Sequence, residues 1–149
     1  MPRALLRTAI AAAVLSLALV AAAPLPAAPP DSNYTVTRLA SDIPGVAPTL
    51  DANLVNGWGL ARSATSPWWV ADNGTDKTTI YNGAGALQMI GGHPFQDVSG
   101  GPTGAVFSGI AGQFQVGTTA APTTLGTSNF VFASEDGMIR AWRGGYSCK

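Results

Sequence analysis

Four side chains with oxygen atoms suited to chemistry stand at two similar places in the chain. Asp72 and Asn73 immediately precede one glycine, and Glu135 and Asp136 immediately precede another. Carboxylate and amide oxygens are the ligands that Ca²⁺ prefers in proteins. The four residues are therefore candidate metal ligands, either for a bound calcium ion or for a metal-dependent catalytic centre.

The same residues are also explained by turn chemistry. Asn-Gly and Asp-Gly are strong hairpin signals, because both residue types tolerate the positive φ that tight turns require. A calcium site would also need ligands from several repeats of the chain. The turn interpretation is favoured on these grounds, so no cofactor is predicted and Ca²⁺ remains the alternative.

The two runs belong to a sequence repeat. Gly59 corresponds to Gly104, 45 positions later, and Ala71 corresponds to Ala133, 62 positions later. A spacing near 45 is typical of one four-stranded propeller blade. The extra residues of the second copy fall at about 108–128, where we expect a loop or a small hairpin. Ile80 is matched to Ile139 in the same way.

Short segments between connections rich in Gly, Asn, Ser and Pro predict the strands of these repeats, and period-2 alternation predicts the strand that precedes them. The first blade covers about 56–91, and the partial second blade covers about 102–143 without a fourth strand. The expected strands of the first blade are 58–61, 68–72, 78–82 and 86–90, and 33–39 is expected as an earlier strand. The predicted fold is all-β: a partial β-propeller of about one and a half four-stranded blades after an N-terminal signal helix.

The first 28 residues are predicted to be a secretory signal peptide and the start of a Pro/Ala spacer. Arg3 and Arg7 precede an apolar run over 8–23, which is shorter than the ~20 residues that span a bilayer. Cleavage is expected after Ala22 or Ala27. The sequence thus predicts a secreted or extracytoplasmic protein with no stable membrane span after cleavage, and an incomplete propeller domain over 29–149.

Charge and cysteine content exclude several function classes. The chain has eight basic and eight acidic residues, and two of the basic ones lie in the leader. The remaining excess of acid argues against nucleic acid and anionic membrane surfaces as partners. The single cysteine, Cys148, excludes an internal disulfide framework. His93 stands alone between glycine and proline and is interpreted as a surface residue.

Aromatic residues recur at the expected strand positions. The favoured interpretation is packing between neighbouring blades, and the alternative is stacking against a sugar or peptide ligand. The set consists of Trp58, Trp68, Trp69, Tyr81, Phe130, Phe132 and Trp142.

Several short motifs carry a resemblance to a known family. They are Asp51, 53–56, Trp58-Gly59, 69–74, 81–83 and 132–137. With these motifs the chain resembles the N-terminal part of a family of secreted bacterial β-propellers of uncharacterised function. The family's blades are like those of NHL and streptogramin-lyase propellers, and some members carry a C-terminal cell-surface sorting signal. Family members are longer, so the resemblance implies a truncated fragment, and it supplies no catalytic residues.

The predicted function is that of an exported propeller used as a binding or surface module, with an unknown extracellular ligand or protein partner. The alternative is a metal-dependent, lactonase-like hydrolase or lyase. Its first candidate residues are Asp72, Asn73, Glu135 and Asp136. An incomplete second blade leaves apolar faces and a strand edge open, so we expect the isolated chain to be poorly soluble or partly unfolded.

Overall fold

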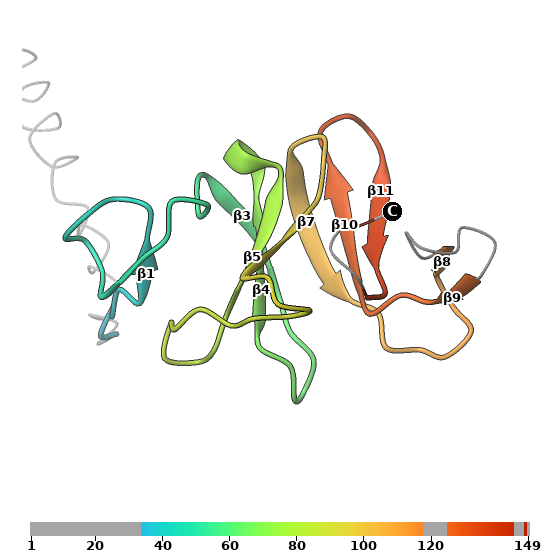
Figure 1. Ribbon diagram of the computed structural model, residues 1–149, viewed down its shortest axis with the longest axis horizontal. Helices are drawn as coiled ribbons and strands as arrows, with labels where there is room; N and C mark the ends of the chain where they lie inside the picture. The colour runs from blue at the N-terminus through green and yellow to red at the C-terminus, as the bar shows by residue number, and fades with distance from the viewer. Residues whose placement is uncertain (1–33, 118–124, 145–147, 149) are drawn as a thin grey trace, which may run out of the picture. The chain divides into compact units, whose positions relative to one another are not determined.

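The structure is a computed structural model that describes residues 34–117, 125–144 and 148 (Figure 1). The signal helix predicted within residues 1–28 lies outside this part of the chain. The described strands all belong to one compact unit, Val36–Lys149. These residues form eleven strands and one short 3₁₀ helix, η1 (Asn73–Thr75), and no α-helix. The prediction of an all-β protein is therefore confirmed.

The first sheet is an antiparallel meander in the order β3-β4-β5-β6. Its first three strands, β3 (Gly57–Ala61), β4 (Trp68–Asp72) and β5 (Lys77–Tyr81), lie within one residue of their predicted positions. The turn residues between the strands account for this agreement, since Asn73-Gly74 and Asn82-Gly83 directly follow β4 and β5.

The predicted fourth strand at 86–90 is wrong. Leu87 makes only an isolated bridge with Tyr81, and the chain then turns at Gly91 and Gly92, both with positive φ (62° and 86°). The fourth strand, β6 (Phe95–Asp97), pairs with the start of β5 after this excursion. Two consecutive glycines permit the tight turn that interrupts the edge of the sheet.

The strand predicted at 33–39 is also wrong over its described part. Tyr34 and Val36 are both 85% exposed, and residues 34–39 have no strand partner. Alternation alone does not make a strand without a neighbour to pair with. Pairing starts with the short parallel strands β1 (Ala40–Ser41) and β2 (Thr49–Leu50).

The second sheet is antiparallel with the order β11-β10-β7 in the described part of the chain. Its strands are β7 (Pro102–Phe107), β10 (Phe130–Ser134) and β11 (Ile139–Trp142). Between β7 and β10 lies a separate hairpin of β8 (Gln115–Gly117) and β9 (Leu125–Thr127), which agrees with the small hairpin expected there.

The two sheets repeat the same register, including the same irregularity. In the first sheet, β3 and β4 pair at Gly59↔Ala71, and their pairing skips Trp58. In the second, β7 and β10 pair at Gly104↔Ala133, and their pairing skips Thr103. The repeat inferred from the spacings of Gly59 to Gly104 and Ala71 to Ala133 is thus present in the backbone.

The match of Ile80 with Ile139 is corrected by the register. Ile80 pairs with Trp69, and the equivalent of Trp69 in the second sheet is Val131, which pairs with Ala141. Ile80 is therefore equivalent to Ala141, two positions beyond Ile139. The turn between β10 and β11 is one residue shorter than the turn between β4 and β5, so the third strands are offset by 61 positions (Ile80 to Ala141) where the second strands are offset by 62 (Ala71 to Ala133).

Because side chains alternate across a strand, each sheet has two faces. One face, which we call the front face, carries Ala61, Trp69, Ala71 and Ile80 in the first sheet. In the second sheet the front face carries Val106, Val131, Ala133 and Ala141. The back face has Leu60, Trp68, Val70 and Tyr81 in the first sheet, and Ala105, Phe130, Phe132 and Trp142 in the second.

The core lies between the front face of the first sheet and the back face of the second, and we call this contact the sheet interface. The Trp69 ring stacks on Phe130 with centroids 4.3 Å apart, and it lies 4.8 Å from the ring of Trp142. Trp69 and Phe132 are completely buried. The packing interpretation therefore holds for these aromatic residues, whereas Trp58 is 61% exposed.

The first strands of the two sheets, β3 and β7, lie side by side at this interface (Figure 1). Their backbones approach closely at Gly59. A Cβ atom on Gly59 would lie 2.5 Å from the backbone nitrogen of Ala105 and 2.8 Å from the carbonyl oxygen of Thr103. Only glycine fits at this position without moving the neighbouring strand.

Candidate functional site

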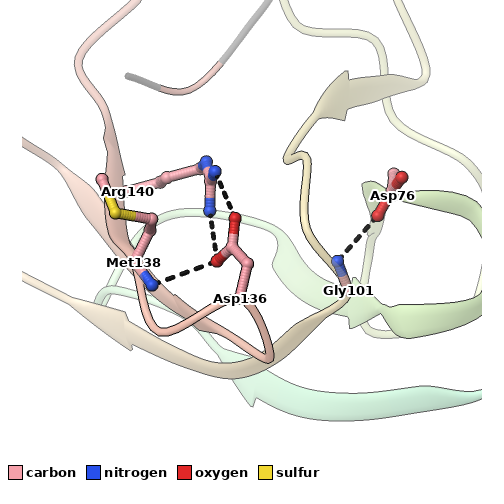
Figure 2. Close-up of polar contacts among 5 residues, drawn as sticks. All are labelled: Asp76, Gly101, Asp136, Met138 and Arg140. Carbon is pink, nitrogen blue, oxygen red and sulfur yellow. Dashed lines mark hydrogen bonds and ion pairs between the residues drawn. The ribbon is translucent and has the colours of Figure 1, made fainter.

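Three loops join at one end of the two sheets, and we call this region the turn surface. They are the β4–β5 turn, the connection from β6 to β7 and the β10–β11 turn. The backbone N–H of Gly101 donates to the Asp76 carboxylate at 2.7 Å (Figure 2). In return, the N–H of Glu135 donates to the carbonyl of Gly101 at 3.0 Å. The Gly101 peptide groups thus connect the turns of both sheets.

Asp136 is engaged within its own turn. Its carboxylate accepts hydrogen bonds from the Arg140 guanidinium, at 2.6 and 3.0 Å, and from the backbone N–H of Met138 at 3.0 Å (Figure 2). The hydrogen bond from Arg140 is the main reason that the pKa of Asp136 lies below its ordinary value. The residue is ionised at neutral pH and closes the β10–β11 turn.

Asn73 and Glu135 come together on either side of Gly101. A Cβ atom on Gly101 would lie 3.0 Å from Asn73 Nδ2 and 3.0 Å from Glu135 Oε2. The Asn73 Oδ1 atom accepts a hydrogen bond from Asn56 Nδ2 at 3.1 Å. Gly101 also has a φ of 66°, so both its conformation and its surroundings favour glycine. Of the four candidate ligands, Asn73 and Glu135 both border Gly101, and Asn73 faces it with its amide nitrogen, which donates hydrogen bonds and does not bind metals.

Asp72 belongs to a different environment. It is completely buried, and its Oδ2 atom accepts a hydrogen bond from the Thr79 backbone N–H at 2.8 Å. Its Oδ1 atom has no hydrogen-bond partner among the described residues. Burial raises the pKa of Asp72 to about 7, and the nearby Asp51 charge adds to the shift. Asp72 is therefore a structural carboxyl group whose charge is costly.

The back face of the first sheet carries a buried polar contact that the sequence motifs did not assign. The Tyr81 hydroxyl donates to Asp51 Oδ2 at 2.7 Å, and the Asn53 backbone N–H donates to Asp51 Oδ1 at 2.9 Å. Burial raises the pKa of the Tyr81 hydroxyl. Asp51 thus attaches the segment before β3 to strand β5. The Asp-x-Asn pattern at 51–53 is the one sequence signal of this turn.

A cavity of about 400 Å³ opens beside this contact, and we call it the apolar groove. Side chains of the segment before β3 form one wall, and the back face of the first sheet forms the other. Its lining includes Leu39, Leu54, Leu60, Trp68, Val70 and Tyr81. The groove has the volume of a small-molecule pocket. Of these six side chains, only Tyr81 has a hydroxyl group, and that hydroxyl already donates to Asp51.

Cys148 and His93 are the two other residues of reactive type, and neither lies near the candidate ligands in the sequence. Cys148 packs against the core, and its backbone N–H donates to the carbonyl of Asp97 at 2.9 Å. Burial raises the pKa of the Cys148 thiol to about 12, so the nucleophilic thiolate is scarce at neutral pH. His93 is exposed, as expected, in the turn that follows Gly92.

Within the described part of the chain, no three His, Cys, Asp or Glu side chains are grouped closely enough to hold a metal ion. No helix among these residues is long and apolar enough to cross a membrane. No family model, curated protein or solved structure matches the chain. The packing of the two sheets and the turn surface are therefore the features of the molecule that bear on its function.

Proposed function

We propose that this chain forms blades of an exported β-propeller and that it serves as a binding or surface module. The observation that supports this most directly is the packing of two equivalent sheets. The front face of the first sheet lies on the back face of the second, with the first strands β3 and β7 side by side. Repetition of one such step generates the ring of a propeller.

The turn surface is the part of this module best suited to binding. Equivalent turns of successive sheets come to the same end, and the hydrogen bonds through Gly101 hold them together. Asp76, Glu135 and Asp136 are exposed there, and the cations beside them in the described part of the chain are Arg140 and Lys77, whose Nζ atom donates to the Thr75 carbonyl. An acidic surface of this kind suits a ligand that carries positive charge or donates hydrogen bonds.

The state of the carboxyl groups favours binding over catalysis. Asp136 is paired with Arg140, and Asp72 is buried and bonded to Thr79. A general acid or base must be able to reach its substrate directly or through one water molecule. In the metal-dependent alternative, Asn73 and Glu135 would be the ligands to examine first, since they share the space around Gly101.

A labelled oligolysine peptide tests the binding proposal. Fluorescence anisotropy should show binding that weakens with salt and is reduced several-fold by Glu135→Gln, because one of the exposed charges is lost. Asp42→Asn, an exposed acid outside the turn surface, is the matched control and should bind like the wild type. Equal loss in both variants, or no binding by the wild type, would contradict a binding role for this surface.

Thermal melting with added CaCl₂ tests the alternative. The binding-module proposal predicts the same Tm with and without the ion. A rise in Tm that Glu135→Gln abolishes and Asp42→Asn preserves would instead support the metal-dependent hydrolase or lyase.

Export is tested separately in a bacterial host with a C-terminally tagged full chain. The wild type should be found outside the cytoplasm, cut after Ala22 or Ala27. The double change Leu15→Arg and Leu17→Arg interrupts the apolar run and should retain the protein inside. Uncleaved wild-type protein in the cytoplasm would refute this part of the proposal.

A further inference from the structure

The walls of the apolar groove are fixed at two places. The buried Tyr81 hydroxyl donates to Asp51 Oδ2 at 2.7 Å and holds the segment before β3 against strand β5. The loop after β5 approaches the same segment at Gly85, where a Cβ atom would lie 2.5 Å from the Cβ atom of Leu39. Gly85 also has a φ of 81°, so both its surroundings and its conformation require glycine. The groove is therefore a preformed cavity, as small-molecule sites usually are.

The interior of the groove is apolar and is only partly covered within the described part of the chain. Leu54, Trp68 and Val70 are partly exposed, and Leu60 is 58% exposed. All four line the cavity, whose volume is about 400 Å³. Removal of apolar surface from water is favourable in proportion to its area. The groove therefore suits the apolar part of a small molecule.

Two polar side chains lie together at one end of this groove. Arg62 follows β3 and Asn82 follows β5, and in an antiparallel meander these positions lie at the same end of the sheet. It is the end away from the β4–β5 turn and thus away from the turn surface. The guanidinium carbon of Arg62 lies 5.1 Å from the ring centroid of Trp68, and Asn82 lines the cavity itself. The groove is therefore polar at one end and apolar along its length.

Both polar side chains retain hydrogen-bond donors. Arg62 donates from Nε and Nη2 to two carbonyls of its own loop, at 3.0 and 2.9 Å. The Asn82 Oδ1 atom accepts from two backbone N–H groups of its own turn, at 2.9 and 3.0 Å. Arg62 Nη1 and Asn82 Nδ2 make no hydrogen bond to any residue that the structure describes, and Arg62 forms no ion pair among those residues. What this end of the groove offers a ligand is one positive charge and two donor nitrogens.

We propose that the apolar groove binds a small amphiphilic carboxylate of the medium-chain fatty acid type. Its apolar chain lies along Leu60, Trp68 and Val70, and its carboxylate accepts hydrogen bonds from Arg62 and Asn82. A guanidinium group complements a carboxylate in charge and in geometry, which favours this head group over a neutral or cationic one. The inference goes beyond the proposed function, because this ligand differs in charge from the one expected at the turn surface and binds at the other end of the sheet.

Isothermal titration calorimetry of the full chain with sodium octanoate tests the proposal, at concentrations below those at which octanoate forms micelles. Octanoate should bind saturably with one site per chain. 1-Octanol has the same chain with an uncharged head and should bind more weakly, and octylammonium should bind most weakly, because the polar end of the groove is positive and donates. No saturable binding of octanoate, or binding of octylammonium as tight as that of octanoate, would overturn the proposal.

The position of the carboxylate is tested by Arg62→Gln. This change should weaken octanoate binding several-fold, as expected for an exposed charge pair, and should alter 1-octanol binding little. Arg140→Gln, which removes an arginine at the turn surface, is the matched control and should bind octanoate like the wild type. Unchanged octanoate binding by Arg62→Gln, or an equal loss for octanoate and 1-octanol, would overturn the assignment of the head group to Arg62.

The position of the apolar chain is tested by Leu60→Glu, which places a negative charge on the lining of the groove. It should weaken the binding of octanoate and of 1-octanol alike. Val106→Glu is the matched control, because Val106 is also 58% exposed and lies on a strand of the second sheet. Both variants should retain the wild-type circular dichroism, since both positions are exposed. Equal loss of octanoate binding in the two variants would contradict a site in the groove.

If Leu60→Glu fails to fold, the wild type answers the same question. Nuclear Overhauser effects should connect the chain protons of bound octanoate with the methyl groups of Leu60 and Val70, and their absence at saturating octanoate would overturn the proposal. Binding of oligolysine to the turn surface is a separate measurement that octanoate should not compete with. Failure of the octanoate experiment therefore leaves the proposed function intact, and the converse also holds.

Discussion

The two sheets have nearly the same backbone but differ in what covers their equivalent faces. On the back face of the second sheet, Phe130 and Phe132 are buried by Trp69 and its neighbours from the first sheet. On the back face of the first sheet, the equivalent residues Trp68 and Val70 are only partly covered and border the apolar groove. Similar side chains thus form a core in one place and a surface in the other. Whether a side chain is buried therefore depends on which segment packs against its sheet.

The polar residues of the two sheets differ in the same way. Asp72 of the first sheet is equivalent to Ser134 of the second, since both occupy the bulged position of the second strand. The first sheet therefore contains a buried carboxyl group that the second lacks. Substitutions at equivalent positions separate the contribution of each sheet.

The largest difference is expected between Trp69→Ala and Val131→Ala, which are equivalent positions on the two front faces. Loss of the completely buried Trp69 ring should cost about 3–5 kcal/mol of unfolding free energy. Val131→Ala should lower the unfolding free energy clearly less, because the valine side chain is smaller and lies outside the sheet interface. Urea denaturation followed by circular dichroism measures both. Equal losses would show that the sheet interface is not the main source of stability.

The buried carboxyl group of Asp72 should make stability depend on pH. Because its pKa rises from 3.8 to about 7 on folding, the folded state holds the proton more tightly than the unfolded chain. Its contribution is fully present below pH ~4 and is lost as pH rises through about 7, by at most about 4 kcal/mol. Tm should therefore be lower at pH 8 than at pH 5.

Asp72→Asn should reduce this pH dependence, since the amide keeps an acceptor for the Thr79 N–H without carrying a charge. Ser134→Ala, the change at the equivalent position, should leave it unaltered. A wild-type Tm that does not fall between pH 5 and pH 8 would be inconsistent with a buried, protonated Asp72.

The two equivalent glycines should respond in opposite directions to alanine. Gly59→Ala forces a methyl group against the β7 backbone and should destabilise the chain by about 1–3 kcal/mol. Gly104→Ala has room and should be neutral or stabilise by up to about 1 kcal/mol, because alanine restricts the unfolded chain. Thermal melting at low protein concentration compares them. The same sign in both variants would mean that the close approach of β3 and β7 is absent in solution.

The smallest effect is expected at the turn surface. Arg140→Gln removes the ion pair with Asp136, which is exposed to solvent, so Tm should fall only slightly and less at high salt. Thr75→Ser, in the corresponding turn of the first sheet, serves as a control that keeps its hydroxyl bond to the Asn53 carbonyl. A large loss of stability would show that this ion pair helps to hold the two sheets together.

Local pattern was sufficient to predict the strands that end at clear turn signals. Strands β4 and β5 each end at an Asn-Gly turn, and β3 ends at a loop of small and polar residues that closes with Pro67, so their positions follow from sequence. The fourth strand was misplaced, because Leu87 looks like the next strand residue while Gly91 and Gly92 redirect the chain before pairing resumes. Residues 34–39 alternate in the pattern of a strand but have no partner strand.

The candidate site was only partly predictable, because the repeat indicates which turns are equivalent but not which side chains lie in the sheet. The repeat placed Asn73 and Glu135 at equivalent turns, and they do meet at Gly101. Asp72 was grouped with them by adjacency, but the alternation of side chains and the bulge place it in the sheet with Thr79. The bond between Asp51 and Tyr81 joins residues 30 positions apart, and no local pattern specifies such a pairing.

The central claim is that the front face of the first sheet packs on the back face of the second. Nuclear Overhauser effects between ring protons of Trp69 and those of Phe130 and Trp142 measure this contact directly in a dilute sample. Centroid distances of 4.3 and 4.8 Å predict strong effects for both pairs, together with a contact between Gly59 Hα and the Ala105 amide proton. Effects within each sheet but none between the sheets would contradict the claim.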